Sequence, residues 1–134
     1  MARPVRLLLV EDNEVFRDAL ELLLGLRSDV EVVASVGDGT AAVPACREHD
    51  PDVVLMDYRM PGLDGVQATS AVLDACPGTA VVCLTASIGR SEEDALLEAG
   101  AVACLRKDQE LEAIVAAVHE AATARRDGTH AAHR

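Results

Sequence analysis

Aromatic side chains are almost absent from this sequence. Its 134 residues include one phenylalanine, Phe16, one tyrosine, Tyr58, and no tryptophan. Because 50% of the residues are nevertheless hydrophobic, we expect one packed domain and no general disorder. The core must then be built from Leu, Val, Ile and Ala.

Basic residues are too few to form a surface for nucleic acid. The formal net charge is −11, and no basic stretch is longer than a pair such as Arg125-Arg126. Binding to nucleic acid needs a basic patch that displaces counterions from phosphates, and an acidic surface disfavours docking on anionic membranes. We therefore expect neither nucleic acid nor a membrane as a direct partner.

Long apolar runs and closely spaced cysteines are missing too. The N-terminal apolar stretch ends at Glu11, which is too short for the core of a signal peptide, and no run approaches the length of a membrane span. The four cysteines form no CxxC pair, which disfavours a zinc or redox motif. These features predict a cytoplasmic protein with reduced thiols, in which Cys83 and Cys104 are small core residues.

Five short apolar runs recur along the chain. Several are rich in Val, and they lack the alternation of a half-exposed strand, which favours strands covered on both faces of a parallel sheet. The predicted strands are Leu7–Val10, Val30–Ser35, Val53–Met56, Ala80–Leu84 and Ala101–Leu105.

Helical patterns lie between these runs. We predict helices over about residues 15–24, 40–49, 65–75 and 91–99, and a last helix that begins after Asp108. Gly25 and Gly100 are expected to stop the first and fourth helices. Thr40 and Asp108 are the predicted N-caps of the second and last helices, and Pro44 falls in or near the first turn of the second, where proline is tolerated.

Strands and helices therefore alternate as (βα)5. This order predicts an α/β fold, with a doubly wound five-stranded parallel sheet between two helical layers. The flavodoxin-like strand order 2-1-3-4-5 is favoured. We expect residues 1–126 to form this domain and residues 127–134, which are polar and Ala-rich, to be a short tail or linker stub.

Polar side chains follow four of the predicted strands, at the edge where open α/β sheets bind ligands. Glu11 and Asp12 follow the first strand, and Asp57 follows the third. Thr85 follows the fourth strand and Lys107 the fifth. Two unit charges 4 Å apart repel by roughly 4 kcal/mol at an effective dielectric constant of about 20, so three converging carboxylates predict a bound divalent cation. Oxygen ligands favour Mg²⁺ or Mn²⁺.

This set of groups also predicts chemistry. A cation, a hydroxyl and an ammonium group around one carboxylate make a site for a phosphoryl group. The cation and Lys107 would neutralise the phosphoryl oxygens, and Asp57 would be the nucleophile.

Four stretches carry a specific family resemblance. Over about residues 5–122 the chain resembles a response-regulator receiver domain of two-component signalling. The matching stretches are LLLVEDN from Leu7, DVVLMDYRMPGLDG from Asp52, VCLTA from Val82 and LRK from Leu105. The segment from Glu14 to Leu20 further resembles the subfamily whose members often carry a C-terminal helix-turn-helix domain.

The resemblance implies a role for each matching residue. Asp57 would accept phosphate from a phosphohistidine on a sensor histidine kinase or a phosphotransfer protein. Asp12 and Asp57 would ligate Mg²⁺ directly, Glu11 would act largely through water, and the backbone carbonyl of Arg59 would be a further ligand. Lys107 would pair with the phosphoryl group, and Thr85 would move to hydrogen-bond it.

Other positions would tune or transmit the signal. Arg59 and Ser87 occupy positions that, in the family, tune the lifetime of the phosphoryl group. Phosphorylation would switch the surface of the fourth helix, fifth strand and last helix for partner binding or homodimerisation. Cys104 stands where many receivers carry an aromatic residue that turns inward in the active state. The resemblance implies a signalling module that assists only its own phosphorylation and dephosphorylation, and not an enzyme.

Two alternative classes stay open. A phosphohydrolase with an aspartyl nucleophile on a similar sheet would resemble a pattern with a second Asp two residues after the nucleophile, where this chain has Arg59. Steady turnover of an external phosphate ester would favour that class. A degenerate receiver that only binds proteins would usually have lost an acidic residue or the lysine, and neither is lost here. Partner binding unaffected by Asp57→Asn would favour it.

Overall fold

The computed structural model describes residues 3–58, 63–86 and 89–126, and its elements alternate as the sequence predicts. The strands are β1 Val5–Val10, β2 Val30–Val36, β3 Val53–Asp57, β4 Ala80–Thr85 and β5 Ala103–Arg106. The α-helices are α1 Glu14–Gly25, α2 Ala42–His49, α3 Gly65–Ala75, α4 Arg90–Glu98 and α5 Leu111–Arg126, and a 3-10 turn, η1, spans Gly39–Ala41.

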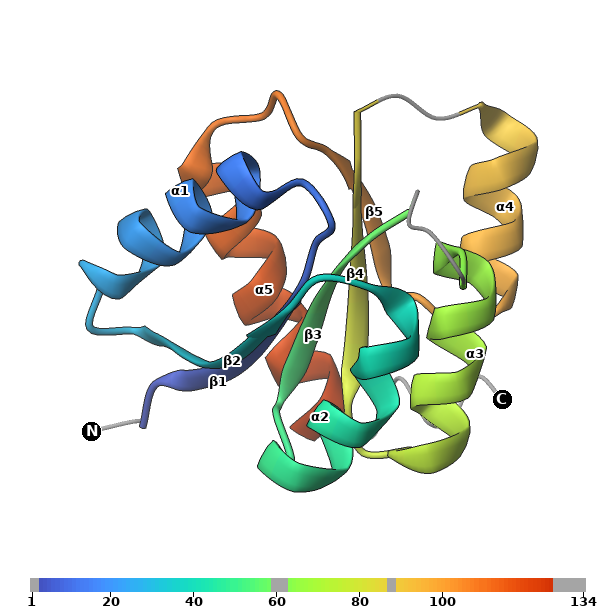
Figure 1. Ribbon diagram of the computed structural model, residues 1–134, viewed down its shortest axis with the longest axis horizontal. Helices are drawn as coiled ribbons and strands as arrows, with labels where there is room; N and C mark the ends of the chain where they lie inside the picture. The colour runs from blue at the N-terminus through green and yellow to red at the C-terminus, as the bar shows by residue number, and fades with distance from the viewer. Residues whose placement is uncertain (1–2, 59–62, 87–88, 127–134) are drawn as a thin grey trace.

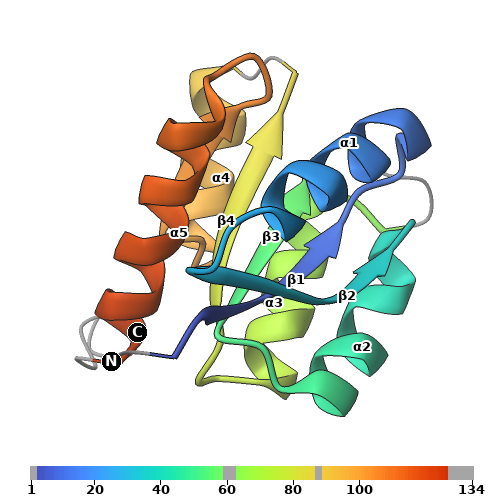
Figure 2. The same cartoon turned by 90° about the vertical axis from the view of Figure 1, so that its left-hand side faces the viewer.

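The five strands form one sheet in the order β2-β1-β3-β4-β5, and every neighbouring pair is parallel. This confirms the predicted flavodoxin-like arrangement. The views in Figure 1 and Figure 2 show α1 and α5 on one face of the sheet and α2, α3 and α4 on the other. None of the helices in the described ranges combines the length and the apolar character needed to span a bilayer.

Each face of the sheet packs its own aliphatic core. Alternate residues of a strand point to opposite faces, so Leu7 and Leu9 of β1 join the core under α1 and α5, whereas Leu8 and Val10 join the core under α2, α3 and α4. The side chains of the central strand β3 are buried along its whole length. The two cores hold the carboxyl ends of β1, β3 and β4 in fixed positions at one edge of the sheet.

Two predicted caps are wrong. Asp38, not Thr40, caps the start of the second helical segment, because its carboxylate accepts a hydrogen bond from the Ala41 amide at 3.0 Å and nucleates η1 before α2 begins. Asp108 does not start α5, which begins at Leu111. Asp108 instead pairs with Arg106, and the Gln109 side chain accepts a hydrogen bond from the Arg106 amide, which extends the turn before the helix.

The fifth strand begins two residues later than predicted, at Ala103. The amide of Ala101 donates to the Leu96 carbonyl at 3.1 Å and closes the end of α4. Gly100 lies between them with a φ of 115°, in the left-handed region that favours glycine, which confirms it as the stop of this helix. Pro44 lies in the first turn of α2, as expected.

Candidate functional site

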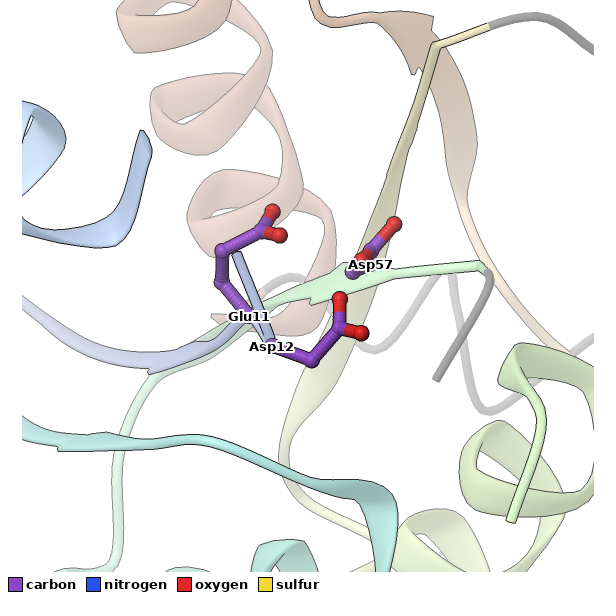
Figure 3. Close-up of side chains that lie close together, drawn as sticks. All are labelled: Glu11, Asp12 and Asp57. Atoms are coloured by element: carbon purple, nitrogen blue, oxygen red, sulfur yellow. The ribbon is translucent and has the colours of Figure 1, made fainter. Parts of the chain in front are cut away.

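Three acidic side chains meet beyond the carboxyl ends of two central strands. Glu11 and Asp12 directly follow β1, and Asp57 is the last residue of the adjacent strand β3. One carboxylate oxygen from each of the three residues lies within 4.8 Å of the others. Figure 3 shows the three side chains directed toward a common space. The structure therefore brings together the acidic residues that the sequence placed at this edge.

Glu11 is a buried carboxylate, with 1% of its surface exposed. Its Oε2 accepts hydrogen bonds from the Lys107 ammonium at 2.9 Å and from the Asn13 amide at 3.0 Å. Its Oε1 is also buried and has no hydrogen-bond partner among the described residues. A buried carboxylate oxygen without a partner is costly, and a hard cation in the cluster, directly or through water, would satisfy it.

The surroundings of Asp57 disfavour the negative charge of its side chain. The residue is 4% exposed, and burial raises the pKa of its carboxyl group to about 7, helped by a hydrogen bond with Asp12 and by the charge of Glu11. The Lys107 ammonium, 3.5 Å from Asp57 Oδ1, partly opposes this rise in pKa. A cation bound between the carboxylates would favour the ionised form, which is the nucleophilic one.

Lys107 reaches the acidic cluster from β5. Its amide donates to the Thr85 carbonyl at 2.8 Å, which fixes the backbone after the strand. Its side chain is only 18% exposed, and the ammonium lies 2.9 Å from Glu11 Oε2 and 4.8 Å from the centre of the Phe16 ring. The ring and the two carboxylates stabilise the positive charge in a partly dehydrated place.

Thr85 and Cys104 occupy different parts of the fourth and fifth strands. Thr85 is the last residue of β4 and is 1% exposed, so its position at the same edge as Asp57 is fixed by the sheet. Cys104 lies on β5 against the core under α2, α3 and α4 and is not part of the acidic cluster. Arg59 and Ser87, also predicted to act at the site, lie outside the described residues.

Three further residues contact Glu11 or Lys107 near the acidic cluster, and none of them was predicted from the sequence to act there. Asn13 caps α1 by accepting a hydrogen bond from the Phe16 amide at 3.0 Å, and the Arg17 guanidinium donates to the Glu11 carbonyl at 2.7 Å. An asparagine directly before a helical pattern is a cap signal that could have been used. Nothing in the one-dimensional pattern indicates that Phe16 would lie under Lys107.

The exit from β3 is held close to the start of α3. The Gly65 amide donates to the Tyr58 carbonyl at 2.8 Å, and a Cβ on Gly65 would lie 2.8 Å from the Tyr58 Cα. Only glycine permits this approach without a backbone shift. Asp64 and Gln67 complete the turn with a reciprocal capping box. The contact holds Tyr58, the residue after Asp57, against the start of α3.

Comparisons with known proteins agree with this geometry. The family model of the response regulator receiver domain matches residues 7–119. The transcriptional regulatory protein LnrK of Bacillus subtilis is 34% identical over 114 residues, which are 85% of this chain and 52% of LnrK. The probable transcriptional regulatory protein NarL of Mycobacterium tuberculosis is 37% identical over 121 residues, which are 90% of this chain and 56% of NarL.

A solved structure has the same fold. The signal receiver domain of the putative response regulator NarL from Mycobacterium tuberculosis superposes with a TM-score of 0.85 at 36% sequence identity, and the match covers 91% of this chain and 98% of that domain. The chain spans about half the length of these two relatives, which are named as transcriptional regulators, in agreement with the subfamily that the segment from Glu14 to Leu20 resembles. The family model, the relatives and the fold agree that the chain belongs to the response regulator receiver domain family of two-component systems.

Proposed function

We propose that this receiver accepts a phosphoryl group on Asp57 from the phosphohistidine of a sensor histidine kinase or a phosphotransfer protein. The observation that carries the proposal is the place of the Asp57 carboxylate, which lies in one cluster with two other carboxylates and 3.5 Å from the Lys107 ammonium. An anionic nucleophile next to a cation and a cation-binding cluster suits attack on a phosphoryl group.

Mg²⁺ fits the residues present, because the cluster offers oxygen ligands only and leaves the buried Glu11 Oε1 without a partner among the described residues. When bound, the cation supplies charge neutralisation for the incoming phosphoryl oxygens. Asp12 and Asp57 would hold it directly and Glu11 largely through water, with the Arg59 carbonyl as a further ligand. Mn²⁺ has the same ligand preference.

The other side chains then have separate tasks. An Asp57 oxygen attacks phosphorus, and the bond from phosphorus to the donor nitrogen breaks. Lys107 remains within reach of Asp57 and neutralises the phosphoryl oxygens, and the Thr85 hydroxyl donates a hydrogen bond to one of them. Arg59 and Ser87, at the sequence positions that have this role in the family, tune how fast water hydrolyses the aspartyl phosphate.

We place the output surface on α4, β5 and α5. The structure offers a link from the site to this surface: Tyr58 directly follows Asp57 in the chain, and its hydroxyl lies 3.5 Å from Glu92 Oε2 in the first turn of α4. The Glu92 Oε1 accepts a hydrogen bond from the Gly89 amide at 2.8 Å. With Cys104 in place of an aromatic ring, we propose that the loop after Thr85 and α4 shift without an aromatic gate.

The partners follow from charge and surface. A net charge of −11 supports protein partners rather than direct contact of this chain with nucleic acid, and homodimerisation through α4, β5 and α5 is the proposed response to phosphorylation. We propose residues 1–126 as the receiver and residues 127–134 as a short tail or linker stub. The proposed role is signalling, without turnover of an external substrate.

The test is covalent modification of the purified chain by a small acyl phosphate. With Mg²⁺, intact mass measurement should show the addition of one phosphoryl group. The modification should be absent in Asp57→Asn and in excess EDTA, and it should persist in Asp74→Asn, which removes an exposed carboxylate of α3. Modification of Asp57→Asn, or equal modification in EDTA, would overturn the proposal.

The same preparations separate the alternatives. A phosphohydrolase would consume a large molar excess of a stable phosphate ester, whereas the receiver should leave it intact. A module that only binds proteins would bind its partner equally well as wild type and as Asp57→Asn, with or without the acyl phosphate.

A further inference from the structure

Two cysteines lie side by side on neighbouring strands at one end of the sheet. Cys83 of β4 and Cys104 of β5 are direct register partners, and both contact the core under α2, α3 and α4. Directly paired residues of parallel strands point to the same face of the sheet, so both thiols lie on the side covered by α2, α3 and α4. Because the two cysteines are far apart in the sequence, no short motif indicates the pair.

The two thiols differ in access. Cys83 is fully buried, with 0% of its surface exposed, whereas Cys104 is half-buried and lines a surface cavity of about 600 Å³. The cavity is lined by Glu93, Cys104, Leu105, Arg106, Asp108 and Gln109. Cys104 is therefore the cysteine of the pair that borders solvent-accessible space, and Cys83 is not among the lining residues.

The two thiols also differ in how readily they ionise. The neighbouring Cys83 thiol holds the pKa of Cys104 below its usual value, against the opposing effects of burial and of the Glu93 charge. The neighbouring Cys104 thiol, together with burial, raises the pKa of Cys83 well above its usual value. Since the thiolate is the nucleophilic form, Cys104 is the thiol that reacts first.

We propose that Cys104 and Cys83 form a peroxide-reactive dithiol that closes to an intrachain disulfide between β5 and β4. The Cys104 thiolate attacks one oxygen of a hydroperoxide, the O–O bond breaks, and the released hydroxide takes up a proton, which leaves a sulfenic acid on Cys104. The Cys83 sulfur then attacks the Cys104 sulfur, the S–O bond breaks, and hydroxide leaves with the Cys83 proton as water. Two thiols lose two electrons in total, and the peroxide is reduced.

The strand geometry permits this bond. Neighbouring strands are about 4.7–4.9 Å apart, within the span of about 4.4–6.8 Å that disulfides bridge between Cα atoms. Because β5 is an edge strand of four residues, hydrogen-bonded within the sheet only to β4, it can adjust to the final sulfur geometry. The proposal uses only this pair and its cavity, so it does not rest on phosphorylation of Asp57.

A second pair of thiols provides a matched comparison. Cys46 of α2 and Cys76, which follows α3, are also neighbours. Burial raises the pKa of the Cys46 thiol to about 12, and its sulfur lies 3.8 Å from the Thr79 hydroxyl. Each pair thus contains one buried and one half-buried cysteine. Changing the half-buried member of each pair to serine therefore gives two matched variants, one in the proposed site and one outside it.

The test treats the reduced full chain with equimolar hydrogen peroxide and measures intact mass and tryptic peptides without reductant. The wild type should lose two hydrogen masses, and dithiothreitol should restore them. The loss should be absent in Cys104→Ser and retained in Cys76→Ser. Trypsin leaves Cys76 and Cys83 together on the peptide of residues 60–90, so a link from that peptide to Cys104 in Cys76→Ser identifies Cys83.

Three results would overturn the proposal. The first is a wild type that keeps all its hydrogens, the second is a link between Cys46 and Cys76, and the third is stable addition of oxygen to Cys104 without a crosslink. A link between the peptide of residues 60–90 and the Cys104 peptide is mapped in the wild-type chain, and fragmentation of that peptide between Cys76 and Cys83 assigns the linked cysteine without relying on the folding of either serine variant.

Discussion

At the scale of single residues, the ammonium group of Lys107 balances the negative charge of two carboxylates, Glu11 and Asp57. Lys107 donates to Glu11 Oε2 at 2.9 Å while lying 3.5 Å from Asp57, so one ammonium serves two buried carboxylates. The arrangement depends on the reach of a lysine, whose compact charge differs from the planar fork of an arginine. The site therefore requires at position 107 both a positive charge and the compact shape of an ammonium group.

Replacing Lys107 by arginine should be a severe change although the charge is retained. The longer planar group cannot keep both carboxylate contacts in a space that leaves Lys107 only 18% exposed. Loss of one charged hydrogen bond, about 1.5–3 kcal/mol, predicts a fall of about tenfold or more in the rate of phosphorylation by acyl phosphate. The reverse exchange at the exposed neighbour, Arg106→Lys, is the control and should leave the rate unchanged. Equal rates in all three proteins would remove Lys107 from the site.

Asp57→Asn should stabilise the metal-free protein in a pH-dependent way. The folded pKa of Asp57, about 7, lies above its ordinary value of 3.8, so the folded state holds an extra proton between these values. The stability contributed by this group is full below about pH 4 and is lost as the pH rises through about 7. The gain in the free energy of unfolding on mutation should therefore grow over this window, to the order of 2 kcal/mol.

Urea denaturation in EDTA from pH 5 to pH 8 measures this difference. Asp74→Asn, at an exposed site, should show no such trend. A gain that is the same at both ends of the pH range would contradict a raised pKa at Asp57, and saturating Mg²⁺ should reduce the advantage of the variant because the cation neutralises the carboxylates.

At the scale of elements, the end of α4 depends on one glycine. Gly100 has a φ of 115°, and an added Cβ would overlap Leu73 Cδ1 of α3. Gly100→Ala should lower the free energy of unfolding by about 2 kcal/mol or more. Gly25→Ala is the matched control, since an added Cβ there meets nothing within 4 Å and should be neutral or slightly stabilising. Thermal or urea unfolding compares the two, and equal stability would show that α4 and α3 adjust freely.

Phosphorylation should alter hydrogen exchange mainly between Thr85 and Val118. This segment contains α4, β5 and the first half of α5, and the contact of Tyr58 with Glu92 connects its first helix to the residue beside Asp57. A ligand that favours one of two arrangements shifts the population of that segment. Exchange measured by mass spectrometry should slow or redistribute there. Changes confined to residues 14–50 would place the signalling surface elsewhere.

The sequence predicted the elements better than their ends. The apolar runs located all five strands because strands buried on both faces leave continuous hydrophobic stretches. The polar residues that follow these runs lie at the predicted edge of the sheet, where Glu11, Asp12 and Asp57 form a cluster and Lys107 contacts it. The caps at Thr40 and Asp108 were wrong because nearby carboxylate and amide side chains compete for the same backbone groups. Contacts between distant residues, such as Phe16 with Lys107, leave no local signal.

At the scale of the whole molecule, the parallel sheet explains why one small domain can bring these groups together. The order β2-β1-β3-β4-β5 puts the carboxyl ends of β1 and β3 side by side, and those of β4 and β5 next to them. The acidic pair, Asp57, Thr85 and Lys107 therefore reach one edge although they are spread over much of the chain. The buried residues of the two cores that hold that edge are aliphatic or small, and Phe16 and Tyr58 pack against them while only partly buried.

The central claim is that Asp57 itself carries the phosphoryl group, and the most direct measurement is chemical trapping of its position. Borohydride reduces an aspartyl phosphate to homoserine, which is stable to digestion and can be placed by peptide fragmentation. After reaction with acyl phosphate and Mg²⁺, the wild type should contain homoserine at position 57 alone, and samples in EDTA should contain none. Homoserine at position 12 instead, or no reduced residue in a chain that has gained a phosphoryl mass, would contradict the account.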